Sequence, residues 1–219
     1  LTSIAIPDTV TSIGYGAFKE ATLLNSITFG VNSQLASIEN DTFYKTALTS
    51  IAIPDTVTSI GYGAFYKATS LNSITFGAGS LLNTIGFYAF SESALTSIAI
   101  PNTVTVIGTY AFYKATSLNS ITFGANSQLT SIGYAAFRNA SALTTIAIPD
   151  LVTSIGSNAF LSTGLTRVYL TEDLTIDGTT YAIGTSGSFF GADDVSFEEP
   201  PLEPLPLQPQ QLPSLPLCF

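Results

Sequence analysis

The side chains that usually carry catalysis are scarce in this chain of 219 residues. The sequence has no histidine and one cysteine, Cys218, and its carboxylates are too scattered to suggest an acid–base pair. It has no Cys-x-x-Cys pair, no Gly-x-Ser-x-Gly sequence and no phosphate-binding loop. We therefore predict a protein that is not an enzyme, with no catalytic residue, no cofactor and no bound metal ion.

One column of oxygen-bearing side chains could suggest calcium. Asp8, Asp55, Asn102 and Asp150 each follow a proline at equivalent positions. Calcium needs several oxygens at once, but these residues occur in alternate repeats. At ~4.8 Å per repeat, successive members would lie roughly 10 Å apart. We therefore expect them to shape turns rather than bind metal.

Tyrosines and lysines recur beside a repeated phenylalanine. Tyr44, Tyr66 and Tyr113 follow that phenylalanine directly, and Lys67 and Lys114 come next. We call this set the Tyr/Lys ridge. It could stack on glycans or pack against another chain; alternatively, the rings only cover the edge of the core.

A second candidate contact surface is small and uncharged. It follows short stretches that alternate apolar and polar residues, with the polar side chains pointing outward. Binding hot spots are usually Trp, Tyr or Arg, and this surface has none before the last repeat. The bland alternative is Thr and Ser chosen for strand formation alone. Its residues are Asn25, Ser26, Thr28, Asn72, Ser73, Thr75, Asn119, Ser120, Thr122, Arg167 and Tyr169.

Two Asn-x-Ser/Thr sequences, at Asn40 and Asn139, match the N-glycosylation pattern. Both fall on the turn side of the repeat, away from the longer strands. In a chain this rich in Asn, Ser and Thr the matches acquire meaning only for a secreted eukaryotic protein.

These residues are positioned by a 47-residue unit. Residues 1–18 recur letter for letter at 48–65, and residues 66–78 recur at 113–125. Each unit splits into two related repeats, so that odd and even repeats alternate. The repeats, called coils one to eight below, begin at Leu1, Leu24, Leu48, Leu71, Leu95, Leu118, Leu143 and Leu165.

The first coil shows how each repeat is expected to fold. Residues 1–6 alternate like a short strand that ends at Pro7. A second extended stretch, residues 10–13, meets Gly14, the residue that most easily adopts a positive φ if the backbone there needs one, and a helical or 3₁₀ turn should begin at Ala17. A column of phenylalanines should run through the core: Phe18, Phe43, Phe65, Phe90, Phe112, Phe137 and Phe160.

The spacing I-P-x-x-V-x-x-I-G-x-x-A-F-x-x-A-x-x-L, kept through residues 1 to about 170, resembles the BspA-like leucine-rich repeat. Period and resemblance predict a β-rich solenoid. It should be a right-handed superhelix of about eight coils of 22–25 residues. Each coil should give one short strand to a parallel sheet, with short extended or 3₁₀ turns on the other side. Alanines replace a cysteine frequent in the family, and Glu39 replaces the turn glycine of coil two, which should distort that turn.

Charge and composition divide the chain further. The net charge is −9: up to Leu170 there are seven acidic and six basic residues, and beyond it eight acidic and none basic. A chain without a basic stripe is a poor partner for nucleic acid or anionic membranes, and no apolar run approaches the ~20 residues of a membrane span. We predict a solenoid over 1–170, a degenerate C-terminal cap over 171–197 and an acidic Pro/Leu-rich tail over 198–219.

Three functions remain open. The resemblance implies a non-enzymatic extracellular or cell-surface protein that mediates adhesion or recognition of a protein or glycan ligand. Alternatively, the apolar face of coil one is covered by another copy, and head-to-tail stacking gives an extracellular filament, with the leucines of the tail docking as a strap. Cys218 would then crosslink chains or remain a free thiol. A remote alternative is ice or polysaccharide binding by the Thr/Ser lattice.

Overall fold

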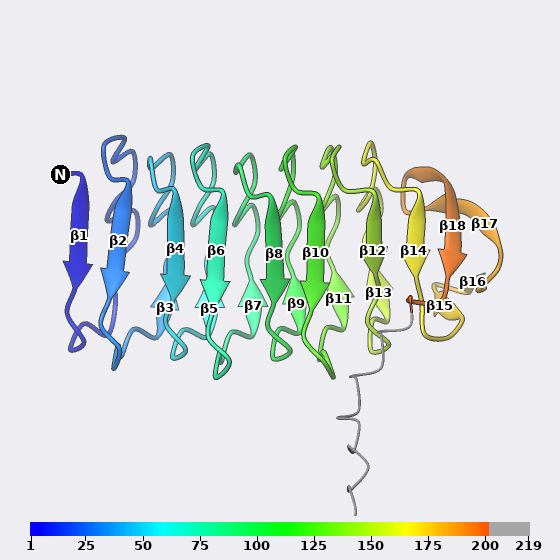
Figure 1. Cartoon of the computed structure of the whole chain (residues 1–219), viewed down its shortest axis with the longest axis horizontal. Helices are drawn as coiled ribbons and strands as arrows, with labels where there is room; N and C mark the ends of the chain where they lie inside the picture. The colour runs from blue at the N-terminus through cyan, green and yellow to red at the C-terminus, as the bar shows by residue number, and fades with distance from the viewer. Residues whose placement is uncertain (202–219) are drawn as a thin grey trace, which may run out of the picture.

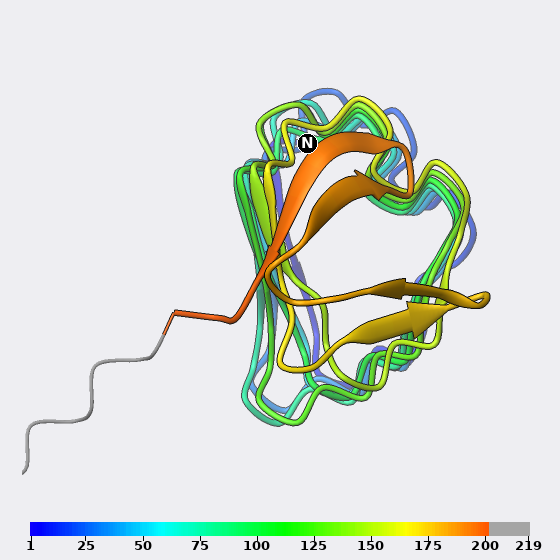
Figure 2. The same cartoon turned by 90° about the vertical axis from the view of Figure 1, so that its right-hand side faces the viewer.

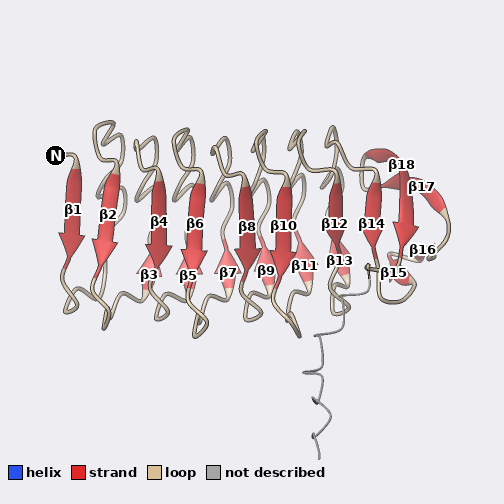
Figure 3. Cartoon of the chain, in the orientation of Figure 1, coloured by secondary structure: helices blue, strands red, loops and turns tan. Residues whose placement is uncertain are grey.

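The chain winds into a β-solenoid whose coils lie side by side (Figure 1, Figure 3). The computed structural model describes residues 1–201. No helix occurs in this part of the chain, and the predicted β-rich solenoid is confirmed. The front strands are β1 (Ser3–Ile6), β2 (Ser26–Phe29), β4 (Ser50–Ile53), β6 (Ser73–Phe76), β8 (Ser97–Ile100), β10 (Ser120–Phe123), β12 (Thr145–Ala147) and β14 (Arg167–Tyr169). The back strands are β3 (Ser37–Ile38), β5 (Ser59–Ile60), β7 (Thr84–Ile85), β9 (Val106–Ile107), β11 (Ser131–Ile132) and β13 (Ser154–Ile155).

Strand pairing differs between the two faces. The back strands form one continuous parallel sheet from β3 to β13, whereas the front strands of coils one to six pair in twos. Proline explains the interruption. Gly124 donates its N–H to Ile100 O at 3.0 Å, but Pro54, at the same position of coil three, has no N–H to offer coil two. The front face therefore repeats every two coils, as the sequence does.

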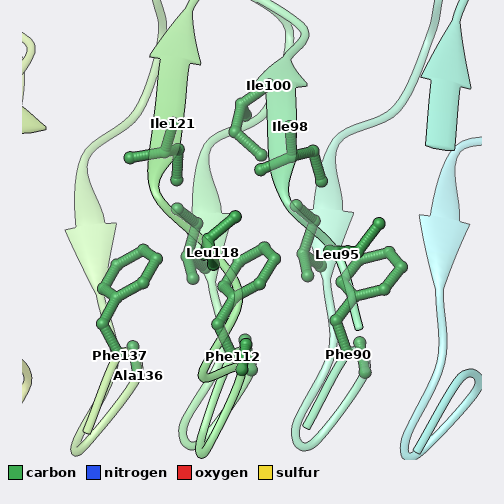
Figure 4. Packing of buried hydrophobic residues seen from close by; sticks show 14 of the residues in the cluster. Phe90, Leu95, Ile98, Ile100, Phe112, Leu118, Ile121, Ala136 and Phe137 are labelled. Atoms are coloured by element: carbon green, nitrogen blue, oxygen red, sulfur yellow. The ribbon is translucent and has the colours of Figure 1, made fainter. Parts of the chain in front are cut away.

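The phenylalanine column forms the centre of the core. Phe90, Phe112 and Phe137 are fully buried, and their rings stack at centroid distances of 5.4 and 5.2 Å (Figure 4). The whole predicted column, from Phe18 to Phe160, is confirmed with spacings of 5.2–5.5 Å. Full burial of one such side chain is worth about 1.5–3 kcal/mol. Because each ring is covered by the rings of adjacent coils, no coil completes its own core.

The predicted helical or 3₁₀ turn is wrong. The segment between the back strand and the next front strand, which we call the turn flank, is a series of reverse turns. In coil five, Tyr110, Phe112 and Lys114 donate their N–H groups to coil six at 2.7–3.0 Å, whereas the residues between them close turns within the coil. A helix would direct every N–H along its own axis and leave the next coil without these bonds.

The turn flank has two left-handed residues in each of coils one to seven. Tyr110 and Lys114 have φ of 56° and 55°. Non-glycine residues adopt such angles infrequently, and here the inter-coil hydrogen bonds hold them in place. The positions involved are Gly16, Glu20, Asp41, Lys45, Gly63, Lys67, Tyr88, Glu92, Tyr110, Lys114, Ala135, Asn139, Asn158 and Ser162.

Gly14 and its equivalents in later coils do not have a positive φ, and this glycine column instead allows close approach of adjacent coils. A Cβ on Gly133 would lie 2.5 Å from Thr109 N in the preceding coil. The N–H of Gly133 donates to Ile107 O at 2.8 Å, and four other glycines of the column make the same bond. Within residues 1–201 no such bond joins Glu39 to coil one, and the back sheet begins only at β3. Glu39 therefore coincides with a break in this ladder.

Four strands cover the last coil. A hairpin is formed by β15 (Leu174–Ile176) and β16 (Thr179–Tyr181). Strand β18 (Ala192–Glu198) pairs with β14 and with β17 (Ser186–Phe189), and these strands cross the end of the solenoid in Figure 2. Phe189 stacks on Phe160 at 5.3 Å and so extends the phenylalanine column. The predicted tail docking and Cys218 lie outside the described residues.

Candidate functional site

The strand face, meaning the outward side chains of the front strands, is neutral over most of its length. In β10, Ser120 and Thr122 are exposed and Ile121 between them is buried. The nine predicted residues of coils two, four and six are all exposed or half-buried. Odd coils have alanine where even coils have threonine, so the threonine hydroxyl recurs only in every second coil.

The two large residues of the strand face lie at its C-terminal end. Arg167 Nε is 3.4 Å from Glu198 Oε1 on the neighbouring strand β18, and Tyr169 is half-buried. Arg167 is thus already paired within the chain. The strand face therefore offers few of the aromatic or arginine anchors that dominate binding energy.

The turn flank carries a connected cluster of aromatic rings. Tyr44 and Tyr66 lie 5.4 Å apart between centroids, Tyr66 and Tyr88 5.5 Å, and Tyr88 stacks on Tyr110 at 4.9 Å. Tyr110 then meets Tyr113 of its own coil at 5.3 Å. These contacts therefore connect Tyr44, Tyr66 and Tyr113 of the predicted ridge. The connection runs through Tyr88 and Tyr110, which were not part of that ridge. The full cluster is Tyr44, Tyr62, Tyr66, Phe87, Tyr88, Tyr110, Tyr113 and Tyr134.

Tyr88 and Tyr110 lie at a different repeat position from the residues of the predicted ridge. They stand at left-handed positions, with φ of 56° each, two residues before the phenylalanine column. Coil four has the small, buried Ser91 where other coils have Tyr66 or Tyr113, and the row continues through Tyr88 instead. In the sequence, the role of Tyr88 is indicated by Ser91, which replaces the ridge tyrosine three residues later.

Five of the six basic residues of the chain belong to the turn flank. The ammonium groups of Lys45, Lys67 and Lys114 lie 5.0–5.2 Å from the ring centroid of the preceding tyrosine. Such cation–π contacts are weak where the ammonium group is exposed to water. The fold therefore places the predicted ridge on one flank as Tyr–Lys pairs in coils two, three and five, with Ser91 and Glu92 at these positions in coil four. The five basic residues are Lys19, Lys45, Lys67, Lys114 and Arg138.

Carboxylates neutralise the N-terminal part of the turn flank. Lys19 Nζ lies 2.9 Å from Asp41 Oδ2, which also accepts a hydrogen bond from the Tyr15 hydroxyl, and Lys45 Nζ lies 3.1 Å from Glu20 Oε1. These hydrogen bonds raise the pKa of both lysines. The pairs join adjacent coils, but exposed ion pairs add little to stability.

Titration of the tyrosines also reflects their neighbours. Burial raises the pKa of Tyr88, and a hydrogen bond with Tyr134 raises that of Tyr110. The pKa of Tyr134 is lowered by hydrogen bonds with Asn158 and Tyr110, with a contribution from the charge of Arg138. The pKa values of these tyrosines, which lie in coils four to six, therefore depend on one another.

The Asp and Asn side chains that follow the prolines lie against the turns of the next coil and, apart from the half-buried Asp8, are exposed. The Asp55 carboxylate lies where a side chain on Gly77 would stand, and the hydroxyl of Thr171 donates to Asp150. No group of three or more His, Cys, Asp or Glu side chains in residues 1–201 is arranged to hold a metal ion. At the glycosylation sequences, Asn40 Oδ1 accepts the N–H of Tyr62 at 2.8 Å and Asn139 has a φ of 63°.

The chain is similar to a known repeat family and to several solved structures. A family model described as "BspA type Leucine rich repeat region" matches six copies over residues 1–81 and 83–183. No curated protein matches the chain. The part of the chain that the structure describes contains no helix with the length and hydrophobicity of a membrane span.

Solved structures with the same fold come from several bacteria. The pneumococcal vaccine antigen PcpA has a TM-score of 0.58 at 20% identity, and the match covers 78% of this chain and 62% of that one. A Treponema pallidum leucine-rich repeat protein has a TM-score of 0.55 at 24% identity, covering 69% of each chain. One from Bacteroides ovatus has 0.50 at 24%, covering 80% and 59%. At these identities the likeness concerns the fold.

Proposed function

Because the chain belongs to the BspA-type leucine-rich repeat family, we propose that it is a non-enzymatic recognition or adhesion protein of the cell surface or extracellular space. Its binding surface is the turn flank, and its ligand is a protein or a glycan. The observation that carries the proposal is the eight-membered aromatic cluster with its lysines. Tyrosine presents an apolar ring and a hydroxyl together, which suits a recognition surface.

Two further observations support this role. Tyr62 and Tyr134 remain 47% and 39% exposed, although their rings are packed against other rings of the cluster. An open groove of about 500 Å³ runs beside the cluster, with Lys45, Lys67 and Thr69 among its lining residues. Exposed rings fixed in place by their neighbours lose little conformational freedom when a ligand binds. An extracellular location accords with the description of the pneumococcal protein as a vaccine antigen.

Binding to a panel of glycans and extracellular matrix proteins tests the proposal. The variant Tyr66→Ala/Tyr113→Ala removes two rings of the cluster and should weaken saturable binding by at least about tenfold. The matched control is Thr75→Ala/Thr122→Ala on the strand face, which should bind within about twofold of the parent protein. Equal affinities of all three proteins, or a loss confined to the strand-face variant, would refute a role for the turn flank.

A filament built by head-to-tail stacking is a second candidate, because each coil pairs with the next through equivalent strands and stacked rings. At the last coil, however, Phe189 covers Phe160, so stacking there would require the strands that follow to move away. Size-exclusion chromatography with light scattering distinguishes the recognition protein from the filament subunit. We expect a monomer at micromolar concentration, and concentration-dependent assemblies would favour the filament.

A further inference from the structure

Coils five and six carry two basic residues on a stretch of the turn flank that has no acidic residue. Between Glu92 and Asp150 the sequence contains no Asp or Glu, and its only charged residues are Lys114 and Arg138. The same chain has a net charge of −9. A local charge of +2 against this background attracts anions to one part of the flank.

These two cations differ from the lysines of coils one and two, and share with Lys67 the absence of a salt bridge within residues 1–201. Lys19 and Lys45 are neutralised by Asp41 and Glu20. Within residues 1–201, by contrast, neither Lys114 nor Arg138 forms a salt bridge. The Nε of Arg138 is buried and has no hydrogen-bond partner in that part of the chain, so it is not open to a ligand from outside. The planar guanidinium of this half-buried residue can meet carboxylate or sulfate oxygens through its terminal nitrogens.

The two cations lie among tyrosines of adjacent coils. Lys114 donates its backbone N–H to Arg138 O at 2.9 Å, and its ammonium lies 5.2 Å from the Tyr113 ring centroid. Tyr110 meets the rings of Tyr113 and Tyr134 edge-on at 5.3 and 5.4 Å. Charge and aromatic surface are therefore available side by side.

We propose that this part of the turn flank binds an acidic glycan, whose sugar rings pack on the tyrosines while its carboxylate or sulfate groups meet the two cations. The inference rests on the proposed recognition function and names the ligand class of the same surface. The acidic-glycan site consists of Tyr110, Tyr113, Lys114, Tyr134 and Arg138.

The backbone argues for a glycan rather than an acidic peptide. Extended peptides are commonly held by hydrogen bonds to a free strand edge. Here the N–H groups of Tyr110, Phe112 and Lys114 are all used in bonds to coil six. Recognition must therefore come from side chains, namely rings, hydroxyls and the two cations. Two cations are also far fewer than the phosphate contacts that hold nucleic acids.

Binding of defined polymers to the full chain tests the site. The probes are chondroitin sulfate, hyaluronan, which carries carboxylates alone, neutral dextran and poly-glutamate. We expect the parent protein to bind one or both acidic polysaccharides and neither dextran nor poly-glutamate. Lys114→Gln/Arg138→Gln should weaken that binding by about tenfold for each cation removed. The matched control is Lys19→Gln/Lys45→Gln, which alters two paired cations of the same flank and should change affinity by less than about twofold. Circular dichroism and urea midpoints confirm that both variants are folded.

Each other outcome overturns the assignment. Failure to bind either acidic polysaccharide refutes it, as does binding that survives Lys114→Gln/Arg138→Gln. Equal binding of poly-glutamate would show that charge alone is recognised and would refute the glycan. If a neutral glycan or matrix protein binds and Tyr66→Ala/Tyr113→Ala abolishes it, the acidic-glycan site is wrong while the proposed function stands. Absence of any ligand across both panels contradicts both.

Discussion

Replacing Gly133 by alanine should force apart two coils at their closest approach. The new Cβ would lie 2.5 Å from Thr109 N and 2.6 Å from the carbonyl carbon of Gly108, both backbone atoms that cannot rotate away. Restoring an ordinary contact of 3.4 Å requires a shift of about 0.9 Å, which would strain the 2.8 Å bond from Gly133 to Ile107. Overpacking of this kind costs about 1–3 kcal/mol, and the lost flexibility of the unfolded chain returns only about 0.4–1 kcal/mol.

Gly14→Ala is the matched control, because Gly14 occupies the same repeat position in coil one and a Cβ there meets nothing within 4 Å. We expect Gly133→Ala to lower the free energy of unfolding by about 1–3 kcal/mol and Tm by about 2–12 °C. Gly14→Ala should be neutral or slightly stabilising. Urea and thermal unfolding followed by circular dichroism measure both. Equal effects of the two substitutions would refute the close-approach explanation for this glycine column.

Three further predictions concern the core, the flank and the strand face. Phe112→Ala, which removes a fully buried ring between Phe90 and Phe137, should cost about 3–5 kcal/mol in urea unfolding, whereas a loss below about 1 kcal/mol would show that the column is not a shared core. Burial raises the pKa of Tyr88 and Tyr181 above 10.0, and hydrogen bonds to Asp41 and Glu20 raise those of Lys19 and Lys45 above 10.5. These groups contribute fully to the free energy of unfolding below pH 10, and the contribution is lost as the pH rises through their folded-state pKa values. The urea midpoint should therefore fall above pH 10. Tyr134, whose pKa is lowered, contributes in the opposite direction. The strand face, whose threonines alternate with alanines, should give no thermal hysteresis in ice-growth measurements, and clear hysteresis would revive the ice-binding alternative.

The core could be predicted because it depends on one repeated choice of residue. Each phenylalanine of the column occupies the same place in its repeat, and only a stack with aligned coils buries all of them. The helical turn was predicted from local pattern alone. Its failure comes from hydrogen bonds between residues more than twenty positions apart, such as Phe112 to Ala136.

The candidate site could be predicted in part. Tyr44, Tyr66 and Tyr113 share a repeat position, so their alignment followed from the period. The links through Tyr88 and Tyr110 depend on left-handed backbone at two tyrosines, which residue preference does not indicate. The ion pairs of the N-terminal coils were foreseeable in principle, since Lys19 and Asp41 are separated by about one repeat. The unpaired state of Lys114 and Arg138 became visible only once those pairs were located.

The interdependence of the coils is tested most directly on an isolated unit. A peptide of residues 48–94 contains one complete 47-residue repeat. It keeps the stacked pair Phe65 and Phe90 but lacks Phe43 and Phe112, the rings that cover this pair from outside. Under conditions in which the full chain is folded, the far-UV circular dichroism and amide NMR spectra of this peptide should be those of an unfolded chain. A dispersed spectrum with cooperative unfolding from the peptide alone would contradict a core shared between coils.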